Sequence, residues 1–366
     1  MQQERTVRGR PTEGPTPYKL WQQEQGIPVV TGYAVEDLNA LPLAPWPRMG
    51  GLGTFINLEG TARVADAYVC EIPPRSTLNP ERHMYEELIY ILQGRGTTAV
   101  WQERGPRQRF QWQQGSLFSP PLNAWHEIAN TSDEPARILG VTCAPVMIDL
   151  FRNLEFIFNC PFSFTDRYEG EELYFDGQGT LQGRMLETNF IPDVRRLELL
   201  QWDVRGTGST NMIFDMAGNI MEAHSSEIPV GRYKKGHRHG PAAQIILLSG
   251  QGYSLMWTGS TLWNEGEPRV KVDWKPGSFF VPPNRWFHQH FNISPEPARY
   301  LALRFSGGRN PLGRVLGNRA AVETSIRLGG DQIEYEDEDL EIRRTYEAEM
   351  ARTGVEITLP PARRSS

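Results

Sequence analysis

Residues 115–130 read GSLFSPPLNAWHEIAN, and residues 277–292 read GSFFVPPNRWFHQHFN. The stretches that follow, TSDEPARILGV and ISPEPARYLAL, keep the same offset, and about half of the aligned positions are identical. A second match lies upstream, where AYVCEIP at residues 67–73 corresponds to AHSSEIP at residues 223–229. Self-similarity at a fixed spacing is the signature of a repeated structural unit, so the chain contains one domain twice.

The repeated unit is predicted to be made of strands. Short apolar runs such as residues 88–92 and 245–248 alternate with turns rich in glycine and proline, which is typical of a β-sandwich or barrel. The offset changes between Trp101 and Gly115, which predicts a longer hairpin loop in the second copy, because loops tolerate insertions better than strands do. We therefore predict an all-β protein with the following segments: an N-terminal arm (1–54) around the first barrel, a first barrel (55–150), a linker and bridging segment (151–211), a second barrel (212–306) and a tail with a short helix (307–366).

Composition excludes several classes of protein. Of the 366 residues 39% are hydrophobic and 22% are charged, which fits a globular chain with a large core rather than a disordered one. The net charge of −6 offers no basic surface for nucleic acid. No apolar run approaches the roughly 20 residues of a membrane span, and the first residues lack the apolar core of a secretion signal. Three cysteines, at 70, 143 and 160, predict a reducing, cytoplasmic location.

Both repeats resemble the cupin family. Gly115, Pro121, His126 and Asn130 match the spacing of the second cupin motif, and Gly277, Pro283, His288 and Asn292 match it again. An inner glycine of that motif is replaced by Asn123 in the first copy and by Arg285 in the second. Arginine adopts left-handed backbone angles poorly, so we expect a reshaped turn at Arg285. The resemblance implies a bicupin, with two double-stranded β-helix barrels in tandem.

The second repeat is predicted to bind a metal ion through three histidines. His237 and His239 are two residues apart, so on a strand both rings would lie on one face, and His288 supplies a third imidazole. Ala243 occupies the position where most cupins carry glutamate, and Gln244 should point to the opposite face. Imidazole suits iron, manganese, nickel, copper and zinc, so the ligands alone do not select the metal.

The segment HRHGPAAQIILLSG with HQHFN is similar to the iron-binding repeat of gentisate 1,2-dioxygenase and its salicylate and hydroxynaphthoate relatives. The resemblance implies Fe(II) at His237, His239 and His288, ring cleavage of a small hydroxylated aromatic acid by dioxygen, and an acid–base or supporting role for His290. Arg304, a charge in an apolar strand, requires a partner, which is either a substrate carboxylate or an internal acidic residue. In that family the metal repeat is usually the N-terminal one, whereas here it is the C-terminal one.

The first repeat carries an altered set of metal-binding positions. Glu81 replaces the first histidine, and His83, Glu87 and His126 fill the other three positions. Two histidines and a carboxylate could hold a second metal ion. The alternative is a degenerate cupin whose former ligands hydrogen-bond one another.

Two other functions stay open. A metal-dependent isomerase, decarboxylase or lyase would use the ion only as a Lewis acid, and a non-catalytic bicupin would bind a ligand without turnover. We expect a small-molecule substrate as the partner, together with dioxygen if the enzyme is a dioxygenase, and association into a homo-oligomer.

Overall fold

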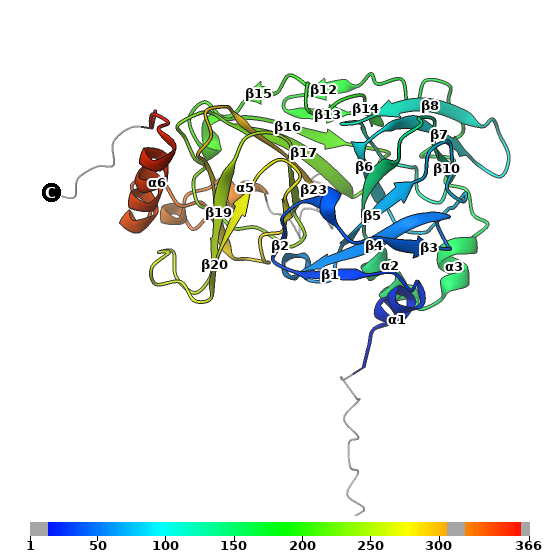
Figure 1. Cartoon of the computed structure of the whole chain (residues 1–366), viewed down its shortest axis with the longest axis horizontal. Coiled ribbons are helices and arrows are strands. Elements are labelled where there is room, and N and C mark those ends of the chain that lie inside the picture. Colours follow the sequence, from blue (N-terminus) through cyan, green and yellow to red (C-terminus); the bar gives the residue numbers. More distant parts are fainter. Residues whose placement is uncertain (1–13, 306–318, 360–366) are drawn as a thin grey trace, which may run out of the picture.

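The computed structural model describes residues 14–305 and 319–359. The expected arm, second barrel and tail therefore extend in part beyond the described residues. The chain is mostly strand and forms two similar halves that lie side by side, with the first half in blue and cyan and the second in green and yellow (Figure 1). No helix in the described ranges is long and apolar enough to span a bilayer.

In each half a large sheet packs against a three-stranded sheet, and apolar side chains of both sheets meet in the core. The first half contains β3 (Ala44–Trp46), β4 (Gly51–Leu58), β5 (Asp66–Ile72), β6 (Glu87–Gln93), β7 (Arg95–Trp101), β8 (Gln108–Gln113), β9 (Leu117–Phe118), β10 (Trp125–Asn130) and β11 (Ala136–Thr142). The second contains β16 (Thr210–Asp215), β17 (Met221–Ile228), β18 (Gln244–Leu247), β19 (Gly252–Trp257), β20 (Arg269–Trp274), β21 (Phe279–Phe280), β22 (Phe287–Asn292) and β23 (Ala298–Phe305).

Strand pairings repeat between the halves. In the first half β10, β7 and β8 form the small sheet, and β22, β19 and β20 form it in the second. The central pairs β5–β11 and β17–β23 are antiparallel in both large sheets. The loop between β7 and β8 spans residues 102–107, whereas its counterpart between β19 and β20 spans 258–268. The predicted longer hairpin loop of the second copy is therefore confirmed.

The segments outside the repeats exchange strands between the halves. α1 (Pro17–Glu24) contacts α2 (Ala144–Phe151), which is followed by α3 (Leu154–Asn159), and β1 (Val29–Gly32) pairs with β4. β2 (Ala34–Val35), however, pairs with β21 of the second half. In return β14 (Phe190–Ile191), from the connecting segment, pairs with β9 of the first half. The arm therefore does not wrap the first barrel alone, as the sequence led us to expect.

This exchange follows the repeat in atomic detail. The Leu38 amide donates to the Gly277 carbonyl at 2.9 Å, and the Val194 amide donates to the Gly115 carbonyl at 2.9 Å. The hydroxyls of Ser278 and Ser116 donate to the carbonyls of Glu36 and Pro192, both at 2.7 Å. Each barrel is thus completed by a short strand that precedes the other barrel in the sequence.

Short elements of the connecting segment extend the large sheet of the second half, and the tail packs against its small sheet. β13 (Met185–Glu187) and β15 (Leu200–Gln201) pair with β16, β12 (Thr180–Gln182) pairs with β13, and short 3-10 turns occur at η1 (Leu38–Ala40), η2 (Glu59–Thr61), η3 (Asp203–Arg205) and η4 (Ile326–Leu328). After α5 (Arg319–Val322), the tail ends in α6 (Leu340–Thr353), at the left in Figure 1. This helix has 14 residues and buries Ile342, Tyr346 and Met350 in an apolar cluster with Tyr233, Tyr253 and Phe291.

Acidic side chains just before α6 hydrogen-bond to the second barrel. The Glu338 carboxylate accepts hydrogen bonds from the Tyr233 hydroxyl and from the Gln289 amide. Asp339 caps α6 and also accepts from the Asn264 amide. These hydrogen bonds connect the tail to the second barrel, although burial outweighs them and raises the pKa of Glu338 to about 7.

The chain that follows each exchanged strand packs closely against a glycine of the other half. Gly115 and Gly277 both have φ of +90°, and a Cβ atom there would lie 2.3 Å from the Asp193 carboxylate or 2.7 Å from the Asp37 carboxylate. Each carboxylate is fixed by hydrogen bonds within its own turn. We expect Gly115→Ala and Gly277→Ala each to lower the free energy of unfolding by about 1–3 kcal/mol, measured by denaturant titration.

Gly259→Ala is the matched control, because Gly259 also has φ of +90° but its nearest outside atom to a new Cβ is 3.5 Å away. It isolates the cost of the left-handed backbone. Equal losses in all three variants would show that the exchanged strands do not press on these glycines.

Candidate metal centre and pocket

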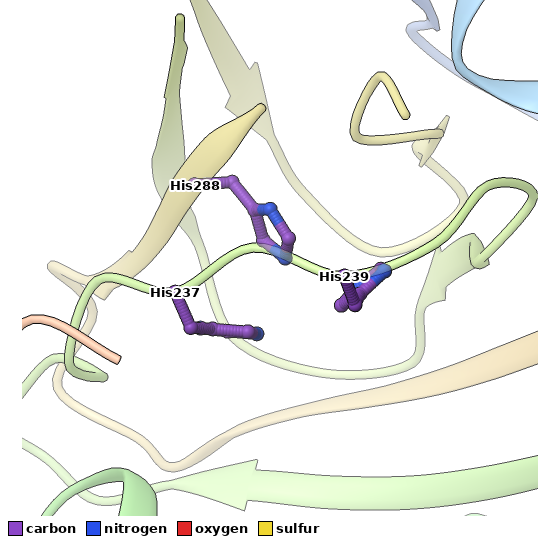
Figure 2. Close-up of side chains that lie close together, drawn as sticks. All are labelled: His237, His239 and His288. Carbon is purple, nitrogen blue, oxygen red and sulfur yellow. The ribbon is translucent and has the colours of Figure 1, made fainter. Parts of the chain in front are cut away.

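Three histidines converge in the second barrel (Figure 2). His237 and His239 come from the segment before β18, and His288 lies on β22. One ligand atom from each ring lies within 4.8 Å of the others. We had expected the His-x-His segment to be a regular strand, but it is not. Instead, His237 pairs with His288 through a single antiparallel bridge.

Backbone carbonyls set the orientation of the three rings. The Nδ1 atoms of His237, His239 and His288 lie 3.1, 2.7 and 3.1 Å from the carbonyl oxygens of Lys235, Gly240 and Trp286. Because a carbonyl oxygen only accepts, each Nδ1 carries the proton, and each Nε2 presents a lone pair. Burial is the largest cause that lowers the pKa of all three rings, to about 4 for His239. The three rings are therefore neutral, as metal ligands must be.

The fourth cupin position carries no ligand in this barrel. Ala243 lines the pocket, while the Gln244 amide points away and donates to the Asp66 carbonyl of the first barrel at 3.1 Å. Both placements agree with the expectation from the sequence. The His288 Nε2 atom is buried without a hydrogen-bond partner, which an ion at the common point of the three rings would supply. The three side chains therefore fit a divalent metal ion with open coordination positions.

The turn that precedes His288 keeps the left-handed backbone that glycine would adopt. Arg285 has φ of +63° and Asn123 has φ of +57°, so the expected reshaping at Arg285 is wrong. The Arg285 amide donates to the His239 carbonyl at 3.0 Å, and its guanidinium makes a two-pronged ion pair with Asp331. These contacts offset the strain of a left-handed arginine and connect the tail to the metal-ligand segment.

His290 lies beside the three ligands but is held differently. The Trp274 indole donates to the Ser254 hydroxyl at 3.0 Å, and that hydroxyl lies 2.8 Å from the His290 Nδ1. The serine proton is thus directed at Nδ1, which leaves the proton of the neutral ring on Nε2. Burial is the largest cause that lowers the pKa of His290 to about 3. His290 is consequently a neutral donor that lines the pocket.

The pocket around the histidines has a cationic wall. Arg304, predicted to meet either a substrate or an internal acid, forms an ion pair with Glu222 across β17 and β23. Arg184 pairs with Glu323 at 3.3 Å. The sequence did not single out the remaining polar pocket residues, which include Trp202, Arg205, Lys234 and Tyr300.

Lys234 and Tyr300 form a buried pair in this wall. The Lys234 Nζ donates to the Tyr300 hydroxyl at 3.0 Å, and each side chain is at most 7% exposed. Burial lowers the pKa of Lys234. Burial alone would raise the pKa of Tyr300, but the neighbouring ammonium outweighs it and the net shift is downward. This pair places a lysine amine and a tyrosine hydroxyl, hydrogen-bonded to each other, inside the pocket.

The first barrel gathers its four candidate ligands in the equivalent place. Ligand atoms of Glu81, His83, Glu87 and His126 lie within 4.8 Å of one another. Several are already engaged: Arg48 pairs with Glu81 at 2.9 Å, and the Tyr68 hydroxyl donates to Glu87 at 2.6 Å. Yet the His83 Nε2, the His126 Nε2 and one Glu87 oxygen are buried without a hydrogen-bond partner.

Charge also differs between the two centres. Burial of Glu81 would raise its pKa, but His126 and Arg48 outweigh this and hold it at about 2. Burial of His126 would lower its pKa, but the two carboxylates outweigh this and raise it. The first centre therefore combines imidazole with carboxylate, whereas the second offers neutral imidazole alone.

The family model and the structural comparison agree on the fold. The family model of the cupin domain matches residues 68–142, which lie in the first barrel. No curated protein matches the chain. Two variants of oxalate decarboxylase OxdC from Bacillus subtilis match its structure with 15% and 16% identity, each over 76% of this chain and 78% of that chain, with TM-scores of 0.50. At this identity the likeness concerns the fold alone. The family model thus shows a cupin domain in the first barrel, and the structural match, which spans most of the chain, shows that the chain has the fold of a two-barrel cupin.

Proposed function

We propose that the second barrel is the active centre of a metal-dependent enzyme, with one divalent ion held by His237, His239 and His288. The observation that carries this proposal is the convergence of one ring nitrogen from each of three histidines in a pocket with a cationic wall, where the His288 Nε2 is buried without a partner. A metal ion bound there would supply a Lewis acid and open positions for a substrate. Three neutral ligands leave its charge intact, which favours an anionic substrate.

The first candidate chemistry is ring cleavage of a small hydroxylated aromatic acid by dioxygen, with Fe(II) as the metal. The three-histidine ligand set and Ala243 in place of a carboxylate support it, because they reproduce the pattern of the dioxygenases that the sequence resembles. In this chemistry the neutral His290 would donate a hydrogen bond from Nε2 to the bound substrate. Manganese, nickel, copper or zinc would bind the same ligands.

The second candidate is a decarboxylation, isomerisation or elimination that does not use dioxygen. Such reactions need a proton to be delivered to, or removed from, a substrate carbon or oxygen while the metal stabilises negative charge. His290, Lys234 and Tyr300 bring three proton-bearing groups to the pocket. This abundance of proton donors gives the oxygen-independent chemistry the more direct structural support.

We place catalysis in the second barrel because its candidate ligands open onto a pocket. His237, His239 and His288 all line one pocket with a free volume of about 70 Å³. Two cavities lie beside Glu81, of about 320 and 10 Å³, but neither is lined by His83, Glu87 or His126. We propose that an ion in the first barrel, bound by Glu81, His83, Glu87 and His126, has a structural role.

Metal analysis of purified protein tests both assignments. We expect close to two equivalents in the wild type and a loss of about one equivalent in His239→Ala, because two imidazoles hold an ion much more weakly than three do. The matched control is His224→Ala, since His224 lines the same pocket without belonging to the ligand group. It should keep the wild-type content, measured by element with mass spectrometry.

His83→Ala reports separately on the first barrel and should also lose about one equivalent. If His239→Ala keeps the wild-type metal content, the second barrel is not the metal centre. If only His83→Ala keeps it, the structural ion of the first barrel is wrong and the catalytic assignment stands.

Oxygen dependence distinguishes the two chemistries. Metal-loaded protein is offered hydroxylated aromatic acids such as gentisate and salicylate, and small aliphatic acids such as oxalate, with and without oxygen. Turnover that persists anaerobically with Mn(II) supports the Lewis-acid chemistry, which we expect because of the three proton donors. Oxygen uptake that matches the loss of an aromatic substrate, with no anaerobic turnover, would instead establish the dioxygenase.

A further inference from the structure

Arg205 is a buried cation that reaches the pocket from outside both repeats. It ends η3 in the connecting segment, and its side chain lines the same cavity as the three histidine ligands. The Lys235 amide donates to the Arg205 carbonyl at 2.7 Å, which ties this turn to the segment that carries His237. The backbone thus fixes Arg205 beside the proposed metal centre.

The Arg205 guanidinium forms no ion pair within 4 Å in the described part of the chain. Glu323 is close enough to raise its pKa, but this carboxylate is paired with Arg184. The one side-chain hydrogen bond of Arg205 goes from Nη1 to the Gln332 amide oxygen at 3.3 Å, although the residue is only 5% exposed. The other arginines of the pocket differ in this respect, because Arg184 pairs with Glu323 and Arg304 pairs with Glu222. Gln332 is itself fixed, since its amide donates to Glu334 at 3.0 Å.

A buried guanidinium without a carboxylate in hydrogen-bond contact is unfavourable unless a ligand supplies that contact. Burial is the largest cause that lowers the pKa of Arg205, to about 10, so the group is still charged at neutral pH. A carboxylate matches the planar fork of a guanidinium with two parallel hydrogen bonds. The pocket therefore offers an anion-binding guanidinium in addition to the proposed metal ion.

We propose that Arg205 binds a carboxylate of the substrate, while a second oxygen group of the same molecule faces His237, His239 and His288. This rests on the proposed function and makes it more specific. The substrate class is a small acid with a further oxygen donor, such as a dicarboxylate, a 2-oxo acid or a hydroxylated aromatic acid. The sequence analysis considered Arg304 as a partner for the substrate carboxylate, but Arg304 is ion-paired with Glu222. We therefore assign this role to Arg205.

The test compares acids with their neutral amides. Mn(II)-loaded protein is titrated with oxalate and salicylate and with oxamide and salicylamide, and binding is followed by calorimetry. We expect the wild type to prefer each acid, and Arg205→Gln to reduce this preference about 10- to 100-fold, as expected for the loss of a charge-assisted hydrogen bond. Arg205→Lys should fall between them, because it keeps the charge but loses the fork.

Arg196→Gln is the control for net charge, since it removes the same charge from the connecting segment at a side chain that is 88% exposed. It should keep the wild-type preference. Metal content and melting temperature are measured on every sample. The proposal for Arg205 is overturned if the wild type shows no preference for acids, or if a folded Arg205→Gln or Arg205→Lys protein with full metal content binds acids as the wild type does. A wild type without metal in the second barrel would instead contradict the proposed function.

Discussion

The candidate metal centre depends on one pair of backbone hydrogen bonds. The His237 amide donates to the His288 carbonyl at 3.0 Å, and the His288 amide donates to the His237 carbonyl at 2.8 Å. Residues that exchange both bonds are directly opposite each other, with their side chains on the same face. This bridge brings the two rings to a centroid distance of 4.2 Å, and the ring of His239, two residues along, completes the group.

The first barrel has the same bridge with different side chains. Glu81 and His126 exchange backbone hydrogen bonds of 3.0 and 2.9 Å. The two centres therefore differ because of a few substitutions on one scaffold rather than because of the fold. Glu81 and Glu87 of the first barrel stand where the second has His237 and Ala243. Tyr68 and Ile128 of the first barrel stand where the second has His224 and His290. These changes make the first centre acidic, and they leave the second with neutral ligands that line a pocket.

The repeat, the all-β fold and the three-histidine group could be predicted because each is encoded locally, in motifs whose spacing fixes which side chains share a face. The strand exchange could not, because β2 and β14 are two-residue strands whose partners lie far away in the sequence. The sequence did contain one sign that the segments before the two barrels correspond to each other. Asp37 and Asp193, which follow the two short strands, lie 156 residues apart, at the same offset as His83 and His239. Arg205 was missed because it lies outside the repeats, and only the folded chain places it beside His237. Domain bounds, oligomeric state and location in the cell remain predictions.

The central claim is that a metal ion occupies the common point of three imidazoles in the second barrel. It is tested most directly by a crystal structure of the metal-loaded protein, with anomalous diffraction measured on both sides of the absorption edge of the metal. The account predicts an anomalous peak within about 2.0–2.3 Å of the Nε2 atoms of His237, His239 and His288. A fully loaded crystal without a peak there, or with the ion held by other side chains, would contradict it.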